Sequence, residues 1–189
     1  MQKILLIDNY DSFTYNLMHY LEYSGNCSVH IFRNDCIDVD AIKDYDSIVI
    51  SPGPGLPKDA GCLMQVLKQY YNSKKILGVC LGHQAIAEFF GATLYNLQQV
   101  YHGVATEINV NSKDTLYENI PSKIKVGRYH SWAVSSDILP NDLEVTATDS
   151  SSIIMSLNHK KYNIKSVQFH PESILTEYGL QLIENWKRI

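Results

Sequence analysis

The stretch Ile76-Leu77-Gly78-Val79-Cys80-Leu81-Gly82-His83-Gln84 indicates how this chain folds. Residues 76–79 are typical of a buried strand, and residues 84–90 are typical of a helix that Gly91 closes. We expect the two glycines beside Cys80 to supply sharp backbone angles and to keep side chains away from a substrate. The first amides of the helix favour a thiolate at this corner. The stretch therefore predicts a nucleophile, whereas an isolated cysteine would be interpreted as a core residue.

Strands and helices are predicted to alternate through the first half of the chain. The strands are 3–7, 29–32, 47–50 and 76–79, and the helical segments are 13–21, 39–43, 60–71 and 84–90. This alternation favours a mainly parallel sheet with helices on both faces. Ligands bind such sheets at the carboxyl ends of the strands, where Cys80 and the rigid loop Ser51-Pro52-Gly53-Pro54-Gly55 both lie.

After Gly91 the pattern changes to short strands with brief connections. The strands are predicted at 92–94, 105–110, 143–148, 152–157 and 164–169, and a closing helix begins at Thr176 or Glu177. We expect these strands to be antiparallel additions to the same sheet. The sequence has no linker or internal repeat, so residues 1–189 are predicted to form one α/β domain with a flavodoxin-like, mainly parallel sheet.

The composition is that of an ordinary globular domain. Of the 189 residues, 45% are hydrophobic and 19% are charged, and a formal net charge of -4 without lysine or arginine blocks argues against a nucleic-acid partner. No run approaches the roughly 18 apolar residues of a membrane span, and the N-terminal apolar run is too short for a signal peptide, so we expect a cytoplasmic protein. The spacing of the cysteines predicts neither a disulfide framework nor a metal site: Cys27, Cys36, Cys62 and Cys80.

A thiol nucleophile needs a base, and Gln168-Phe169-His170-Pro171-Glu172-Ser173 supplies one at the end of a predicted strand. Residues i and i+2 of an extended segment face the same way, so the carboxylate of Glu172 can orient the imidazole of His170. We therefore predict a catalytic triad of Cys80, His170 and Glu172, assembled from two distant pieces of chain. For the other histidines we expect non-catalytic roles: His19, His30, His83, His102, His130 and His159.

Acyl transfer at Cys80 would also need N–H donors for the developing oxyanion. The amide of Leu81 directly follows the nucleophile, and one of the amides of residues 53–55 is the expected second donor. Gln84 lies about one helical turn after Cys80, on the same face of the predicted helix. Its side-chain amide could therefore bind a polar substrate.

Three stretches together resemble the signatures of class I, or triad, glutamine amidotransferases: residues 51–55, 78–84 and 169–173. The resemblance covers nearly the whole chain, and the three stretches in this order are far more specific than any one of them. It implies the class I glutaminase fold, with Cys80 as nucleophile, His170 as general acid and base, and Glu172 as its orienter.

The same resemblance assigns the substrate site. It implies that the glutamine site and oxyanion hole are lined by Gly53, Pro54, Gly55, Leu81 and Gln84. It also implies that backbone at Ser131 and Trp132 holds the α-amino and α-carboxylate end of L-glutamine. No metal or cofactor is implied in this subunit.

Further segments are similar to the small subunits of chorismate-pathway enzymes: residues 8–17, 102–103, 128–131 and 172–176. These subunits are component II of anthranilate synthase and the glutaminase component of 4-amino-4-deoxychorismate synthase. The resemblance implies that ammonia passes to a larger chorismate-binding partner, component I of either synthase. It leaves the choice between the two partners open.

Other functions remain open at this point. An amidotransferase subunit for a different acceptor, such as a nucleotide or carbamoyl-phosphate synthase, would carry the same triad, although residues 8–17 favour the chorismate group. A catalytically silent regulatory subunit is disfavoured by the intact Cys80, His170 and Glu172. Flavin binding is disfavoured because the proline-rich loop lacks the Ser/Thr-rich character that cradles a phosphate.

Overall fold

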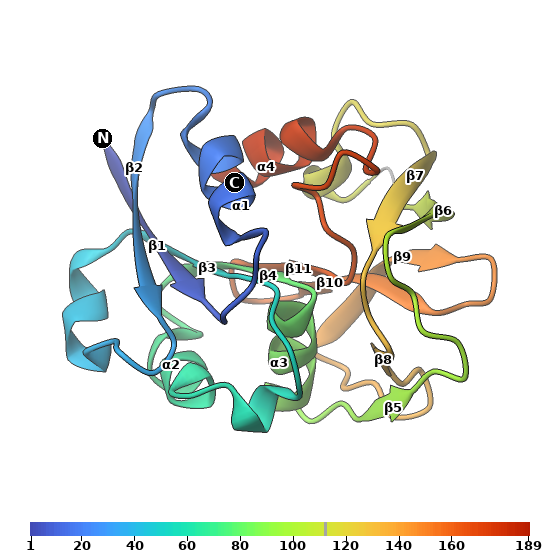
Figure 1. Cartoon of the computed structure of the whole chain (residues 1–189), viewed down its shortest axis with the longest axis horizontal. Helices are drawn as coiled ribbons and strands as arrows, with labels where there is room; N and C mark the ends of the chain where they lie inside the picture. The colour runs from blue at the N-terminus through green and yellow to red at the C-terminus, as the bar shows by residue number, and fades with distance from the viewer. Residues whose placement is uncertain (112) are drawn as a thin grey trace.

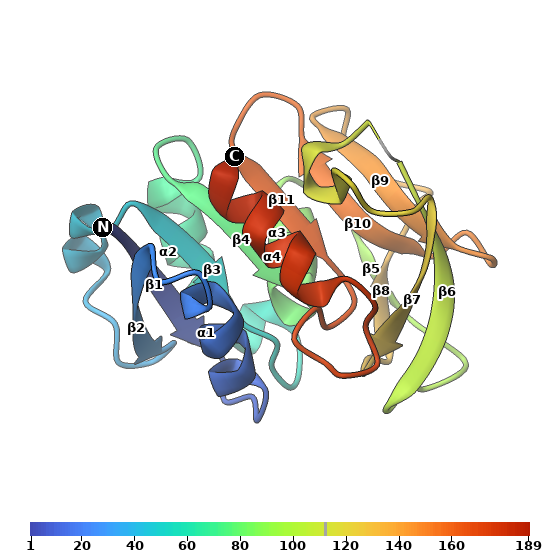
Figure 2. The same cartoon turned by 90° about the horizontal axis from the view of Figure 1, so that it is seen from above.

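The computed structural model describes residues 1–111 and 113–189 (Figures 1 and 2). Its strands are β1 (Gln2–Asp8), β2 (Cys27–Arg33), β3 (Ser47–Ile50), β4 (Lys75–Val79), β5 (Leu94–Asn96), β6 (Val104–Val110), β7 (Lys123–Arg128), β8 (Trp132–Val134), β9 (Leu143–Asp149), β10 (Ile154–His159) and β11 (Ile164–Val167). Its α-helices are α1 (Thr14–Glu22), α2 (Leu63–Tyr70), α3 (Leu81–Phe89) and α4 (Gly179–Arg188). Short 3-10 helices are η1 (Val39–Asp44), η2 (Pro57–Asp59) and η3 (Thr115–Tyr117).

A nine-stranded sheet runs through the molecule in the order β2-β1-β3-β4-β11-β10-β9-β6-β7. The strands from β2 to β11 in this order are parallel, and β10, β9, β6 and β7 extend the sheet in antiparallel fashion. Helices α1 and α4 cover one face of the parallel part, and α2 and α3 cover the other (Figures 1 and 2). The predicted α/β sheet with helices on both faces is confirmed.

The run Ile4-Leu5-Leu6-Ile7 in β1 shows why the parallel part lies inside the molecule. All four side chains are buried, although they point alternately to opposite faces of the sheet. Ile4 and Leu6 join one core cluster with Leu17 of α1, whereas Leu5 and Ile7 join the cluster that includes Leu67 of α2. A continuous apolar strand therefore needs helices on both faces, and each such buried side chain contributes about 1.5–3 kcal/mol.

Two of the strand predictions are wrong. β11 is not an antiparallel addition: it pairs parallel with β4, because the hairpin with antiparallel β10 returns the chain to the direction of β4. The predicted strand at 92–94 corresponds to β5, which pairs with β8 in a separate two-stranded sheet. β7 and β8 were not predicted, although the alternation of Lys123, Ile124, Lys125 and Val126 is a signal for a half-buried strand.

The parallel strands bring four turn segments to one edge of the sheet. β1, β3, β4 and β11 are neighbours, and their carboxyl ends lead directly to Asn9, Ser51, Cys80 and Gln168. The first two segments are joined by hydrogen bonds from Asn9 N to Ser51 Oγ and from Asn9 Nδ2 to Ser51 O, both 2.9 Å long. Within the described ranges, no helix has the length and apolar character to cross a membrane.

Candidate active site

Cys80 occupies the corner between β4 and α3 in a strained backbone conformation. Its φ of 51° and ψ of -100° lie in a region that residues other than glycine rarely adopt. The corner is held by hydrogen bonds from Cys80 N to Val167 O (2.8 Å) and from Gln84 N to Cys80 O (3.1 Å). The predicted corner is confirmed, and the sharp backbone angle falls on the cysteine itself.

The two glycines beside Cys80 have a different role from the expected one. Neither has a positive φ, so they do not supply the sharp angle. A Cβ atom at Gly82 would lie 2.6 Å from the carbonyl oxygen of Ile50, and one at Gly78 would lie 2.5 Å from that of Gly82. The glycines therefore allow α3 to pack closely on β3 and β4.

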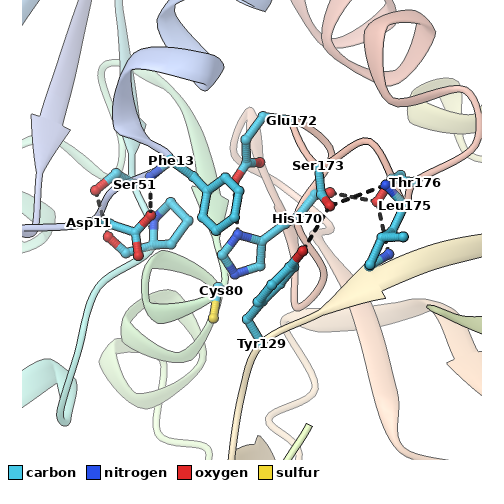
Figure 3. A network of polar contacts seen from close by, with 12 residues as sticks. Asp11, Phe13, Ser51, Cys80, Tyr129, His170, Glu172, Ser173, Leu175 and Thr176 are labelled. Carbon is cyan, nitrogen blue, oxygen red and sulfur yellow. Dashed lines mark hydrogen bonds and ion pairs between the residues drawn. The ribbon is translucent and has the colours of Figure 1, made fainter. Parts of the chain in front are cut away.

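His170 and Glu172 lie together in the protein interior. Nδ1 of His170 is 2.8 Å from Oε1 of Glu172, and the residues are 2% and 3% exposed. Burial disfavours the charged imidazolium, but interactions with Cys80 and Glu172 outweigh it and raise the pKa of His170 well above its usual value. His170 is therefore held as a proton donor, and the structure brings all three predicted triad residues together (Figure 3).

Two aromatic rings enclose the imidazole of His170. The ring centroid of Phe13 is 5.4 Å from that of His170, and the centroid of Tyr129 is 4.7 Å from it. Figure 3 shows both rings beside the imidazole. Tyr129 Oη also lies 3.2 Å from Oγ of Ser173. Neither ring was predicted as a site residue, although both lie in segments that carry the family resemblance. They limit the access of water to His170.

The segment after β11 is fixed by bonds to β7. His170 N donates to Gly127 O (3.0 Å), and Gly127 N donates to Thr176 Oγ1 (2.9 Å). Thr176 Oγ1 in turn donates to His170 O (2.6 Å). These three hydrogen bonds hold the backbone that carries His170 and Glu172.

A cavity of about 190 Å³ opens beside Cys80. It is lined by Gly53, Pro54, Gly55, Cys80, Gln84, Tyr129, His130, Ser131 and Trp132. Six of the seven residues predicted to bind substrate therefore meet beside Cys80. The exception is Leu81, whose side chain is buried in the core and lies outside the cavity lining. Its amide is at the first position of α3, where an N–H group has no intrahelical partner.

Gln84 presents an acceptor to this cavity. Its Nε2 donates to Trp132 O (3.0 Å) and to Gln168 Oε1 (3.1 Å), so both of its N–H bonds are used. Its Oε1 accepts no hydrogen bond from the residues that the structure describes. The atom that remains for a polar substrate is thus suited to an ammonium group or to the N–H of a carboxamide.

The backbone at Ser131 and Trp132 is itself held by hydrogen bonds. Trp132 O accepts from Gln84 and from His130 Nδ1 (2.8 Å), which uses both of its lone pairs, and Ser131 O accepts from Leu97 N (2.7 Å). Trp132 O therefore positions the cavity wall and cannot also bind a ligand. That the remaining backbone groups of Ser131 and Trp132 bind the α-amino and α-carboxylate end of glutamine stays a prediction.

A second cavity, of about 370 Å³, reaches Cys80 from the side of α1. It shares Gly53, Pro54, Cys80 and Tyr129 with the first cavity. The residues that it adds are Tyr10, Asp11, Ser12, Phe13, Pro52, His102 and His170. Cys80 thus stands between two cavities that differ in their lining.

The buried His83 does not contribute to this chemistry. Its Nδ1 lies 2.8 Å from Ser166 Oγ, and burial, with a smaller effect of His130, lowers the pKa of His83 to about 3. It stays neutral at physiological pH and is fully buried. In the described part of the chain, no three His, Cys, Asp or Glu side chains are arranged to hold a metal ion, and the cysteines are free.

Comparison with curated proteins shows close relatives over nearly the full chain. The chain is 44% identical to anthranilate synthase component 2 of Cyanophora paradoxa, over 97% of each chain. It is 44% identical to aminodeoxychorismate synthase component 2 of Escherichia coli, over 97% of this chain and 98% of that protein. It is 41% identical to aminodeoxychorismate/anthranilate synthase component 2 of Bacillus subtilis, over 97% and 94%. Other relatives are longer: the chain spans 32% of a bifunctional protein of Thermotoga maritima and 24% of a multifunctional tryptophan biosynthesis protein of Phycomyces blakesleeanus.

A solved structure and a family model agree with these relatives. The structure is described as that of a GMP synthase subunit from Thermoplasma acidophilum, and it is 27% identical, with a TM-score of 0.87 over 98% of this chain and 92% of that one. The model of the family "Glutamine amidotransferase class-I" matches residues 5–188. The chain, with its cysteine, histidine and glutamate at one edge of the sheet, belongs to the class-I glutamine amidotransferase family.

Proposed function

We propose that this chain is the glutaminase subunit of a chorismate-aminating synthase. It hydrolyses L-glutamine and passes the ammonia to a larger partner subunit. The observation that carries the proposal is the meeting of Cys80, the paired His170 and Glu172, and the cavity lined by residues 53–55 at one edge of the sheet. The strained corner at Cys80 presents the sulfur to that cavity.

The first half of the proposed reaction forms a thioester. The Cys80 thiolate attacks the side-chain carboxamide carbon of glutamine, and the oxygen becomes an oxyanion that accepts N–H bonds from Leu81 and the loop 53–55. His170, kept protonated by its surroundings, gives its proton to the leaving nitrogen, and the C–N bond breaks to release ammonia. Each oxyanion donor would contribute about 3–4 kcal/mol of transition-state stabilisation.

The second half restores the enzyme. Neutral His170 takes a proton from water, and the water oxygen attacks the thioester carbon. The C–S bond breaks with its electron pair on sulfur, glutamate leaves, and the thiolate and imidazolium are regenerated. Side chains and backbone amides supply every step, so we propose that the subunit needs no cofactor or metal. We also propose that it works in the cytoplasm.

The two cavities beside Cys80 support separate routes for glutamine and ammonia. We assign glutamine to the cavity lined by Gln84, Ser131 and Trp132, and ammonia to the cavity on the side of α1. Water at neutral pH would convert free ammonia to unreactive ammonium. An exit screened by the rings of Phe13 and Tyr129 would keep it reactive until it reaches the partner.

The names of the relatives support a chorismate acceptor. They include components of anthranilate synthase and of aminodeoxychorismate synthase, and one relative carries both names. We therefore propose component I of either synthase, or of both, as the partner, which places the chain in tryptophan or folate biosynthesis. The structural similarity to a GMP synthase subunit supports a different acceptor, a nucleotide, as the second candidate.

The test is reconstitution with defined partners. The purified chain is mixed with each component I, chorismate and glutamine, and the aminated product of chorismate is identified by chromatography. We expect anthranilate or aminodeoxychorismate with at least one partner. Glutamate release without an aminated chorismate product from either partner would contradict the chorismate proposal and favour another acceptor.

A further inference from the structure

Gln168 contacts the reacting sulfur, although the sequence pattern gives it no role. Its side chain is completely buried, and its Nε2 donates a long hydrogen bond to Cys80 Sγ (3.6 Å). We propose that Gln168 is a further catalytic residue, whose side-chain N–H stabilises the negative charge on the sulfur of Cys80. This inference rests on the proposed function of Cys80 as the nucleophile.

The strand register places Gln168 beside Cys80. Val167 is the last residue of β11 and pairs with Val79, the last residue of β4. Cys80 N donates to Val167 O, so the two segments are still bonded where both strands end. Gln168 is therefore the first residue after β11 that faces the nucleophile, two positions before His170.

A chain of hydrogen bonds determines which atom of Gln168 faces the sulfur. A backbone carbonyl can only accept, so the group that Gln84 directs at Trp132 O must be its Nε2. The second N–H of Gln84 Nε2 donates to Gln168, and the accepting atom of Gln168 must be its Oε1. The atom of Gln168 left for Cys80 is then Nε2, a donor.

A second set of hydrogen bonds reaches the Trp132 carbonyl oxygen through His130. Arg128 can only donate, and its Nε bonds His130 Nε2 (3.0 Å), so the proton of the neutral ring lies on Nδ1, which donates to Trp132 O. Burial and the nearby Arg128 lower the pKa of His130 to about 4, which keeps the ring neutral. Asp149 holds Arg128 in a buried ion pair of 2.7 Å.

This arrangement matters at two moments of the reaction. A hydrogen bond to an ionised acceptor is roughly twice as strong as one to a neutral acceptor, so the N–H of Gln168 favours the thiolate over the thiol before attack. When water cleaves the thioester, the electron pair of the C–S bond returns to sulfur, and the same N–H stabilises the departing thiolate. His170 acts on protons, and Gln168 acts on the charge of the sulfur.

The test measures the thiolate directly. The rate at which iodoacetamide alkylates Cys80 is followed against pH by mass spectrometry of the peptide that contains it. In Gln168→Met, which keeps the length of the side chain and removes the N–H, we expect the midpoint pH of alkylation to rise by about one unit. In Gln168→Glu, which keeps the acceptor for Gln84 and places a carboxylate at the sulfur, we expect a larger rise.

Two controls accompany these variants. Gln69→Met makes the same chemical change on the exposed part of α2, and it should leave the midpoint unchanged. Gln84→Met removes the residue that orients Gln168, and it should give a smaller rise than Gln168→Met. An unchanged midpoint in folded Gln168→Met and Gln168→Glu, with folding checked by circular dichroism, would overturn the inference.

The alkylation measurement does not require glutaminase activity, so failure of the proposed function and failure of the role of Gln168 can be told apart. If Cys80→Ser retained glutaminase activity, the proposed function would fail whatever the alkylation profile showed. If Cys80→Ser were inactive and the profile did not depend on Gln168, only the role of Gln168 would fail. Glutamine hydrolysis by Gln168→Met at neutral pH should fall by about tenfold, the counterpart of a one-unit shift.

Discussion

The two strand ends that meet at the site are built in different ways. The corner after β4 is shaped by sterics: Cys80 has a positive φ, and Gly82 leaves no room for a Cβ atom against Ile50 O. The segment after β11 is shaped by hydrogen bonds, which join His170 and Thr176 to Gly127 of β7 and His170 to Glu172. The first carries Cys80, the proposed nucleophile, and the second carries His170, the proposed acid and base.

The two constructions predict that each side of the site responds to a different kind of substitution. A steric corner is insensitive to the loss of a polar group but fails when volume is added, because packed backbone cannot move aside cheaply. A hydrogen-bonded segment fails when a donor or acceptor is removed, because the buried partner group is left unsatisfied. Substitutions of the two kinds should therefore separate the two sides of the site.

The largest effect is expected where the chemistry depends on one atom. Cys80→Ser should abolish glutamine-dependent product formation and leave synthesis from added ammonium salts by the partner intact, because the partner needs only ammonia. Both activities are measured on the assembled complex, and Cys62→Ser, at a half-buried thiol outside the site, serves as control. Loss of both activities in a folded, partner-bound Cys80→Ser would contradict this division of labour.

Glu172→Gln tests the hydrogen-bonded side without changing its shape. Losing the charge that orients and stabilises the imidazolium should lower kcat for glutamine hydrolysis by about 10³-fold. Steady-state kinetics on the assembled complex would show this, with Glu107→Gln, in an exposed ion pair, as the control. A decrease of less than tenfold would show that Glu172 is not needed to orient His170.

The same variant predicts a pH dependence of stability. Burial lowers the pKa of His170, but Cys80 and Glu172 raise it well above its unfolded value of about 6.5. The stabilisation is complete below that value and is lost as pH rises through the folded pKa. The loss of unfolding free energy in Glu172→Gln should therefore be larger at pH 6 than at pH 9 by urea denaturation. An equal loss at both pH values would contradict the assignment.

Gly82→Ala tests the steric side. The added Cβ would meet Ile50 O at 2.6 Å, and we expect a loss of about 2–3 kcal/mol in unfolding free energy. Gly25→Ala is the matched control, because Gly25 has a positive φ but no atom within 4 Å of the new Cβ, so only backbone strain of about 1 kcal/mol is expected. Both variants are unfolded by heat and by urea. If Gly82→Ala and Gly25→Ala lost the same unfolding free energy, the close contact with Ile50 would not be what requires glycine at position 82.

Thr176→Val should give the smallest effect and belongs to the hydrogen-bonded side. It leaves Gly127 N and His170 O without their side-chain partner, at a cost of about 1–2 kcal/mol. Because the backbone of His170 is then less well held, glutaminase kcat should also fall by several fold. Thr115→Val, at an exposed position, is the control. If the variant kept its stability but had a reduced kcat, Thr176 would act mainly by positioning His170 and not by stabilising the fold.

Much of the site could be predicted because its parts are local in the chain. The corner at Cys80 follows from residues 76–84, and the pairing of His170 with Glu172 follows from the i, i+2 spacing of an extended segment. The stiffness of the loop 51–55 follows from its prolines. The role of Gly78 and Gly82 could not be predicted in this way, because a Cβ collision depends on backbone that packs from elsewhere in the fold.

Residue types and spacing alone predict Cys80 as the nucleophile, His170 and Glu172 as its partners, and a helix-covered parallel sheet that brings them to one edge. The parallel pairing of β11 with β4, the rings of Phe13 and Tyr129 around His170, and the contact of Gln168 with Cys80 emerge only in the folded structure. The two groups of features differ in the sequence separation of the residues that produce them. Glycine corners and strand periodicity are properties of neighbouring residues, whereas strand order and register are set by the packing of segments about ninety positions apart.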